Sequence, residues 1–161
     1  YSYTYPHQDV FKDYWAAIDY AEEVSKPVFI DFTGQACVNC RKMEDNVFTR
    51  GSIPDLIDFY SRENSKYVIC QLYVDDGRSL ENPETAVVPT SDGKTKKKTL
   101  KTIGNKWSTL QAVTYASSSQ PYYVLYSPKH GLLTNPIGYT PDVNKFENWL
   151  RCGLEEFNNK K

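Results

Sequence analysis

The sequence feature that most constrains the fold is a Cys-x-x-Cys pair, Cys37 and Cys40, placed between a strand-like and a helix-like segment. Residues 28–32 before the pair are apolar, β-branched and aromatic, which is typical of a buried strand. Residues 41–48 after it have the composition of a helix. The pair therefore lies where a strand leads the chain into a helix.

This position gives the two sulfurs different roles. The sulfur of Cys37 lies beside the unpaired N–H groups of the helix, where the helix dipole favours a thiolate, so Cys37 is the expected nucleophile. The sulfur of Cys40 follows one turn later on the same face, where it can resolve a mixed disulfide made by Cys37. This is the arrangement that thiol–disulfide exchange requires.

Two other uses of the pair are open, namely half of a zinc site and inert packing. A zinc site requires a second cysteine pair or histidines at ligand spacing. The other cysteines, Cys70 and Cys152, stand alone, and we predict that both are packing residues. We place His7 on the surface and His130 at the end of the sheet away from the pair. We therefore expect no metal and no cofactor.

Length and charge limit the classes of protein to which the chain can belong. Its 161 residues suffice for a proper core, and we predict a single domain over residues 1–161. The net charge of −1 gives no overall field that would favour nucleic acid. No apolar stretch approaches the length of a membrane span, and no signal peptide is recognisable. Because the chain opens on Tyr1 rather than Met, we expect a processed form or a piece of a longer protein.

Periodicity and turn residues predict the elements around the cysteine pair. Two strands joined by a long helical connection indicate a right-handed βαβ unit, so these strands should be parallel. The predicted elements are an irregular lead-in over 1–9, a helix over about 10–25, a strand over 28–33, a helix over about 38–48, a helix from Ser52 and Pro54 to about 62, and a strand over 67–74.

Residues 75–103 form an insertion that is rich in turn signals and, from 94 to 101, in lysine. We interpret it as a solvated surface loop or a small hairpin. Because strand 67–74 should run parallel to strand 28–33, its end lies at the edge of the sheet that carries Cys37. The insertion therefore begins on that side, where it could shape the access of a partner.

The rest of the chain predicts a helix, a hairpin and a closing helix. Thr140 and Pro141 supply a capping hydroxyl and a first helical residue for the closing helix, which carries an apolar stripe. The predicted elements are a helix over about 105–115, a strand over 122–126, a turn over 127–131, a strand over 132–138, and the closing helix.

This order of elements resembles the thioredoxin fold over nearly the whole chain, an α/β fold with a central mixed sheet flanked by helices. The residues around the cysteines are more similar still to the C-terminal periplasmic domain of DsbD-type thiol:disulfide interchange proteins. Ala36 before the pair and Val38-Asn39 within it differ from the Trp and the Gly-Pro of thioredoxin itself. The segments that carry the resemblance are Lys26-Pro27-Val28, Asp31-Phe32-Thr33-Gly34, Cys37-Val38-Asn39-Cys40-Arg41-Lys42-Met43-Glu44, Tyr73-Val74-Asp75-Asp76 and Gly138-Tyr139.

The resemblance implies a protein-disulfide reductase domain in the periplasm, tethered to the inner membrane. Such a domain accepts reducing equivalents from the transmembrane part of the same longer protein and passes them to periplasmic disulfide-bearing proteins. A periplasmic disulfide oxidase or isomerase is the nearer rival, because Val38-Asn39 does not fix a reduction potential. A thioredoxin-fold metal-binding or chaperone module is the alternative from another class.

Two carboxylates lie at positions that suggest a supporting role. Asp31 stands six residues before Cys37 in an otherwise apolar strand, where a carboxylate is costly unless it has a function. Glu44 follows Cys40 by four residues and shares its helix face, although a solvated helix charge is the other interpretation. The resemblance places both acids beneath the disulfide.

Pro121 precedes a predicted strand and follows Gln120. The resemblance makes this proline part of the cis-proline loop opposite the cysteines, where Gln120 offers backbone hydrogen bonds to an extended partner segment. An ordinary trans proline that opens a strand is the other interpretation.

Overall fold

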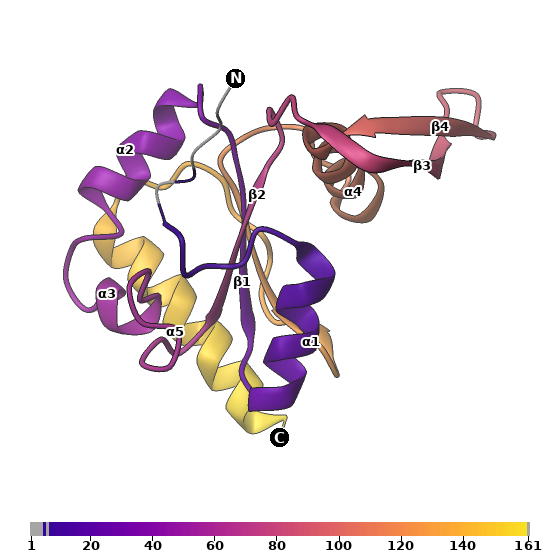
Figure 1. The fold of residues 1–161 in the computed structure, drawn as a ribbon. Coiled ribbons are helices and arrows are strands. Elements are labelled where there is room, and N and C mark those ends of the chain that lie inside the picture. Colours follow the sequence, from indigo (N-terminus) through magenta and orange to yellow (C-terminus); the bar gives the residue numbers. More distant parts are fainter. Residues whose placement is uncertain (1–4, 6, 161) are drawn as a thin grey trace.

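The computed structural model describes residues 5 and 7–160. A mixed sheet has helices on both sides, and a two-stranded hairpin extends from one end of the molecule (Figure 1). Within the described part of the chain, no helix has the length and apolar character needed to span a membrane. The elements in chain order are α1 (Tyr14–Val24), β1 (Val28–Thr33), α2 (Val38–Asn46), α3 (Ile53–Leu56), β2 (Val68–Tyr73), β3 (Ser79–Pro89), β4 (Thr95–Thr102), α4 (Ile103–Tyr115), β5 (Tyr122–Ser127), β6 (Gly131–Leu132) and α5 (Val143–Asn159).

The mixed sheet has the strand order β2-β1-β5-β6. β1 and β2 are parallel, from Val28 beside Val68 to Thr33 beside Tyr73. β5 runs antiparallel to β1, and β6 runs antiparallel to β5. The predicted α/β architecture and its parallel βαβ unit are confirmed, and the ends of β1 and β2 lie at one edge of the sheet.

The two faces of the sheet bury different side chains, because successive residues of a strand point to opposite sides. From β1, Val28, Ile30 and Phe32 belong to the core cluster that includes residues of α1 and α4. Phe29 belongs to the cluster formed with α2, α3 and α5, which lie together on the other side of the sheet (Figure 1). Asp31 shares the face of Phe29 and therefore points toward the side that α2 covers.

The first helix is shorter than predicted. α1 begins at Tyr14 rather than near residue 10, because the Asp13 side chain caps it and Phe11 is held in extended form by a bridge to Cys70. Trp15, in the first turn of α1, is 51% exposed. The helix itself is where the periodicity predicted it, but its start depends on a contact with β2.

The helix predicted from residue 52 to about 62 is a single turn, α3. Ser52 precedes it but makes no side-chain capping hydrogen bond. After α3, the Asp58 carboxylate accepts hydrogen bonds from the N–H groups of Tyr60 and Ser61. These local side-chain bonds favour a turn over a continued helix.

The last strand is also shorter than predicted. β6 has two residues in place of the run 132–138. Pro136 has no N–H to donate to a ladder, which interrupts the strand before Ile137 returns to bridge Tyr123. The predicted hairpin is therefore present, with an irregular second arm.

The closing helix is capped two residues later than predicted. Asp142 is the N-cap, and its carboxylate accepts a hydrogen bond from the N–H of Lys145. The hydroxyl of Thr140 instead donates to the carbonyl of Gly138, so Thr140 is not the cap and Pro141 is not the first helical residue. The carboxylate of Asp142 therefore caps the helix in place of the hydroxyl of Thr140.

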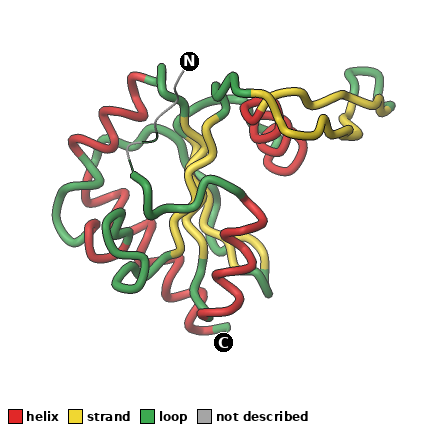
Figure 2. Tube along the Cα trace, in the orientation of Figure 1, coloured by secondary structure: helices red, strands yellow, loops and turns green. Residues whose placement is uncertain are grey.

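The insertion is a hairpin of β3 and β4, which is one of its two predicted forms (Figure 2). It begins at the edge of the sheet where β2 ends and extends beside α4, away from α2 (Figure 1). Both strands contact α4, and Leu100 is buried. At the base of the hairpin, a Cβ on Gly104 would lie 2.5 Å from the carbonyl oxygen of Val74, so the close approach of α4 requires glycine.

The predictions for the isolated cysteines and histidines are confirmed only in part. Cys70 is buried as predicted, but Cys152 is exposed on α5 and is not a packing residue. His7 is half-buried with its ring 4.8 Å from that of Phe59, and burial lowers its pKa. His130 lies in the turn after β5, at the end of the sheet away from the Cys-x-x-Cys pair, as predicted.

Gly153 sets the distance between α5 and the sheet. A Cβ at this position would lie 2.5 Å from both Leu125 Cδ1 and the Tyr67 hydroxyl oxygen. We expect Gly153→Ala to lower the free energy of unfolding by about 1–2 kcal/mol, because overpacking outweighs the gain in helix propensity. Chemical denaturation measures the change, with Cys152→Ala at the exposed neighbouring position as the control. Equal stability of the two variants would contradict this account of the packing.

Candidate active site

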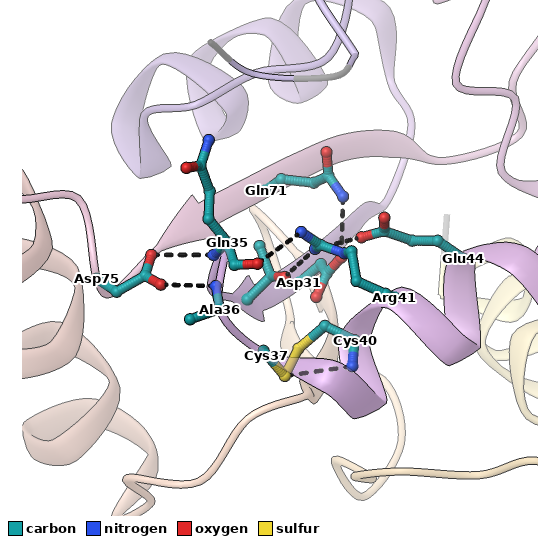
Figure 3. Close-up of polar contacts among 10 residues, drawn as sticks. Asp31, Gln35, Ala36, Cys37, Cys40, Arg41, Glu44, Gln71 and Asp75 are labelled. Carbon is teal, nitrogen blue, oxygen red and sulfur yellow. Dashed lines mark hydrogen bonds and ion pairs between the residues drawn. A yellow bond between two sulfur atoms is a disulfide. The ribbon is translucent and has the colours of Figure 1, made fainter. Parts of the chain in front are cut away.

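The turn between β1 and α2 is held by Asp75, which follows the end of β2. Its carboxylate accepts hydrogen bonds from the N–H groups of Gln35 and Ala36, each at 3.1 Å (Figure 3). Gly34 leaves room for this contact, since a Cβ there would lie 3.0 Å from Asp75 Oδ2. Sequence reasoning gave Asp75 no role, although it lies after the second strand in one of the segments that carry the resemblance.

Cys37 and Cys40 form a disulfide at the start of α2 (Figure 3). Cys37 is the N-cap of the helix, and its sulfur accepts a hydrogen bond from the N–H of Cys40 at 3.2 Å. Cys37 is half-buried, whereas Cys40 is only 1% exposed. An external sulfur can therefore approach Cys37, while Cys40 is shielded behind it.

Asp31 is buried in the sheet on the side that α2 covers, and it is 1% exposed. Its neighbour across β1 and β2 is Gln71, whose Nε2 donates a hydrogen bond to Asp31 Oδ2 at 3.1 Å (Figure 3). Burial raises the pKa of Asp31 to about 7; the Gln71 hydrogen bond opposes this rise, and the charge of Glu44 adds to it. A carboxylate in this state exchanges its proton near neutral pH.

Arg41 links α2 to the end of β1. Its Nη2 donates to Glu44 Oε2 at 2.8 Å and to Thr33 Oγ1 at 3.1 Å. The side chain of Glu44 is 14% exposed, so it is not a solvated helix charge. Burial raises the pKa of Glu44, and the Arg41 guanidinium opposes that rise. Sequence reasoning missed Arg41, because nothing but its place after the pair indicated where its side chain would lie.

The chain returns to the same edge of the sheet just before β5. Because β5 is antiparallel to β1, Tyr122 pairs with Phe32, and the preceding Pro121 lies at the edge that carries the cysteines. The Gln120–Pro121 peptide bond is cis, as the resemblance implies. The Nε2 of Gln120 donates to Gln111 Oε1 at 2.8 Å. Recognition of a partner by the backbone of Gln120 stays a prediction.

These groups together can carry out dithiol–disulfide exchange. A half-buried sulfur and a shielded second sulfur lie where the chain leaves β1, and a buried carboxylate, that of Asp31, lies within β1 two residues before its end. Among the described residues, no cluster of His, Cys, Asp and Glu side chains is arranged to hold a metal ion.

Comparison with known families decides the assignment. The family model described as a thioredoxin-like domain matches residues 14–153. This chain belongs to the thioredoxin-like family. With its Cys37–Cys40 disulfide, it has the fold and the cysteine pair of a thiol–disulfide oxidoreductase. A comparison with curated proteins found no match.

Solved structures share this thioredoxin-like fold at low sequence identity. A thioredoxin from Thermus thermophilus has a TM-score of 0.56 at 18% identity, over 88% of this chain and 84% of that chain. The reduced C-terminal domain of DsbD from Neisseria meningitidis has a TM-score of 0.56 at 18% identity, over 88% of this chain and 97% of that chain. A DsbH oxidoreductase has a TM-score of 0.55 at 17% identity, over 96% of this chain and 92% of that chain.

The raised pKa of Asp31 couples the stability of the fold to pH. The folded pKa of about 7 exceeds the ordinary 3.8, so the stability that this group contributes is fully present below about pH 4 and is lost as pH rises toward 7. Asp31→Asn removes this ionisation. The free energy of unfolding of Asp31→Asn, relative to that of the wild type, should therefore rise by roughly 4 kcal/mol between about pH 4 and pH 8. Denaturation at both pH values measures the gain, and a pH-independent difference would contradict it.

Proposed function

We propose that this chain is a protein-disulfide reductase domain that exchanges electrons with partner proteins through Cys37 and Cys40. The observation that carries the proposal is the asymmetry of the pair. Cys37 caps the helix and is half-buried, whereas Cys40 is buried behind it. Such an asymmetry suits attack by one thiol and resolution by the other.

The exchange proceeds in two displacements. In the reduced protein, the Cys37 thiolate attacks one sulfur of a partner disulfide, the partner S–S bond breaks, and its other sulfur leaves as a thiolate that takes up a proton. Cys40 then loses its proton, attacks Cys37 Sγ and releases the second partner thiolate. Two electrons pass from the pair to the partner, and the pair ends as the disulfide that the structure contains.

The buried acids support the reducing direction. A low thiolate pKa stabilises the reduced form of a dithiol protein. A protein whose reduced form is stabilised in this way is a strong oxidant. We infer that negative charge on Asp31, and the part of the Glu44 charge that Arg41 does not compensate, disfavours a thiolate on Cys37. Because the pKa of Asp31 is about 7, part of this charge is present at neutral pH. The reduced pair is then less stabilised and donates electrons more readily.

For the source of the electrons and the location, the proposal draws on the likeness to DsbD-type domains. The segment from Asp31 to Glu44 resembles their C-terminal domain, and one such domain shares the fold. We place this chain in the periplasm, tethered to the inner membrane by the transmembrane part of the same longer protein. That part would supply electrons, and periplasmic disulfide-bearing proteins would receive them. Oxidase or isomerase activity at the same pair is the alternative.

Cys40→Ser should accumulate covalent mixed disulfides with a protein substrate, because Cys37 can attack but no second thiol resolves the product. Cys37→Ser should form no such adduct and should lose reductase activity. Non-reducing electrophoresis with insulin as the disulfide substrate measures both results.

The matched control for this experiment is Cys152→Ala, which removes an exposed thiol outside the pair and should leave turnover intact. Trapping by Cys37→Ser would reverse the roles of the two cysteines. A large loss of turnover in folded Cys152→Ala would show that a second redox thiol takes part.

Asp31→Asn and Glu44→Gln should each lower the pKa of Cys37 in the reduced protein, by about 1–2 pH units, and speed its alkylation at neutral pH. The helix start alone would bring a cysteine to roughly 3.5–7.5, so we expect the wild-type value above that range. The double variant should show the larger shift, though not the sum, because the sites are coupled. Thiolate absorbance against pH measures these values.

Asp45→Asn is the control for the titration, because Asp45 is an exposed acid on the same helix. It should shift the pKa of Cys37 least. No shift in either Asp31→Asn or Glu44→Gln would remove both acids from the mechanism, and an equal shift in Asp45→Asn would point to general charge rather than to these two positions.

A further inference from the structure

A groove of about 240 Å³ lies between β3 and α4, away from the cysteine pair. Its lining includes Trp15 of α1, Leu110 and Val113 of α4, and Val87 of β3. Trp15, Val87 and Val113 are 51%, 60% and 45% exposed. Exposed large apolar side chains that gather in one groove offer a surface on which a partner can pack.

β3 presents its backbone edge to this groove. Residues 84–87 all line it, although successive residues of a strand point to opposite faces of a sheet. Because Leu100 of β4 also lines the groove and pairs with Glu84, the groove covers the face that these two residues share. It also reaches the open edge of β3, because Thr85 and Val87, which point to the other face, line it too. In the described part of the chain, β3 pairs with β4 and with no other strand. Its outer N–H and C=O groups are therefore placed to pair with an added strand.

The two edges of the hairpin differ in charge. β4 carries lysines at 96–98, and lysines along an edge strand discourage further pairing. On β3, residues 85–88 are Thr-Ala-Val-Val, uncharged and of mostly high β propensity, between Pro83 and Pro89. The edge that is open to an added strand is therefore that of β3, over a short stretch bounded by two prolines.

The charge of the hairpin indicates what the edge binds. Residues 79–102 contain five lysines and three carboxylates, a net charge of +2, whereas the whole chain has −1. Within the described residues, the lysines at 96–98 form no ion pair. A second copy pairing through β3 would bring two positive hairpins together, whereas an acidic segment would be attracted.

We propose that β3 binds an extended acidic segment of a partner protein by strand addition along residues 85–88. Alternate side chains of the bound segment are apolar and enter the groove over Trp15, Leu110 and Val113. The acidic side chains between them point to the opposite face and are attracted by the net positive charge of the hairpin. This surface goes beyond the proposed redox function and does not use the cysteine pair.

Binding can be tested with the synthetic peptide Gly-Asp-Val-Asp-Val-Asp-Val-Gly. The control peptide has Lys in place of each Asp. Amide signals of residues 85–88 in NMR spectra of the oxidised full chain report binding. We expect these signals to shift with the acidic peptide, binding to weaken with added salt, and the basic peptide to bind at least about tenfold more weakly.

Two variants on separate elements test the geometry. Val87→Asp at the edge and Val113→Asp in the floor should each weaken binding of the acidic peptide at least about tenfold, because each sets a like charge against it. Leu132→Asp is the matched control, since Leu132 is 47% exposed on β6, outside the groove, and it should change binding by less than about twofold. The spread of amide signals shows whether each variant is folded, and Val113→Asp remains informative if Val87→Asp disrupts the hairpin.

The proposal is overturned if the signals of 85–88 do not respond to millimolar acidic peptide, or if both peptides bind equally. Dimerisation through β3 in place of peptide binding would overturn it, as would binding of phosphatidylglycerol vesicles without a response to the peptide. None of these measurements involves turnover of the cysteine pair, so failure here leaves the proposed reductase function to its own tests.

Discussion

The parallel pairing of β1 with β2 is the constraint on which the site depends. It brings the ends of both strands to one edge of the sheet, so that Asp75 can hold the turn over 34–36 that leads into the cysteine pair. It also sets Asp31 beside Gln71 in the interior. A shift of one residue in this register would turn the side chains of one strand to the opposite face and separate these partners.

The layer between the sheet and α2 contains charges that are balanced unequally. Arg41 compensates Glu44 directly through an ion pair of 2.8 Å. Asp31 receives a hydrogen bond from the neutral amide of Gln71, and its burial dominates its pKa. Asp31 is therefore the group whose charge changes near neutral pH, and the net charge of this layer depends on its proton.

The parts of this arrangement that the sequence predicted are those determined by local pattern. The apolar run over 28–33 marked the strand residue for residue, and Asp31 stood out because a carboxylate in such a run is costly. The contacts of Arg41 and Asp75 were not predictable, because they depend on where distant elements meet. Thr140 was a plausible cap, but a carboxylate two residues later took that role. Competing caps of similar strength cannot be ranked from sequence.

The most direct test of the account is the equilibrium reduction potential of the Cys37–Cys40 pair against glutathione. If buried negative charge disfavours the thiolate, the disulfide is the favoured state and the pair is a reductant. The account predicts a value nearer that of thioredoxin, about −270 mV, than that of the strong oxidant DsbA, about −120 mV. A value near the oxidising end would contradict the reductase assignment and support an oxidase or isomerase.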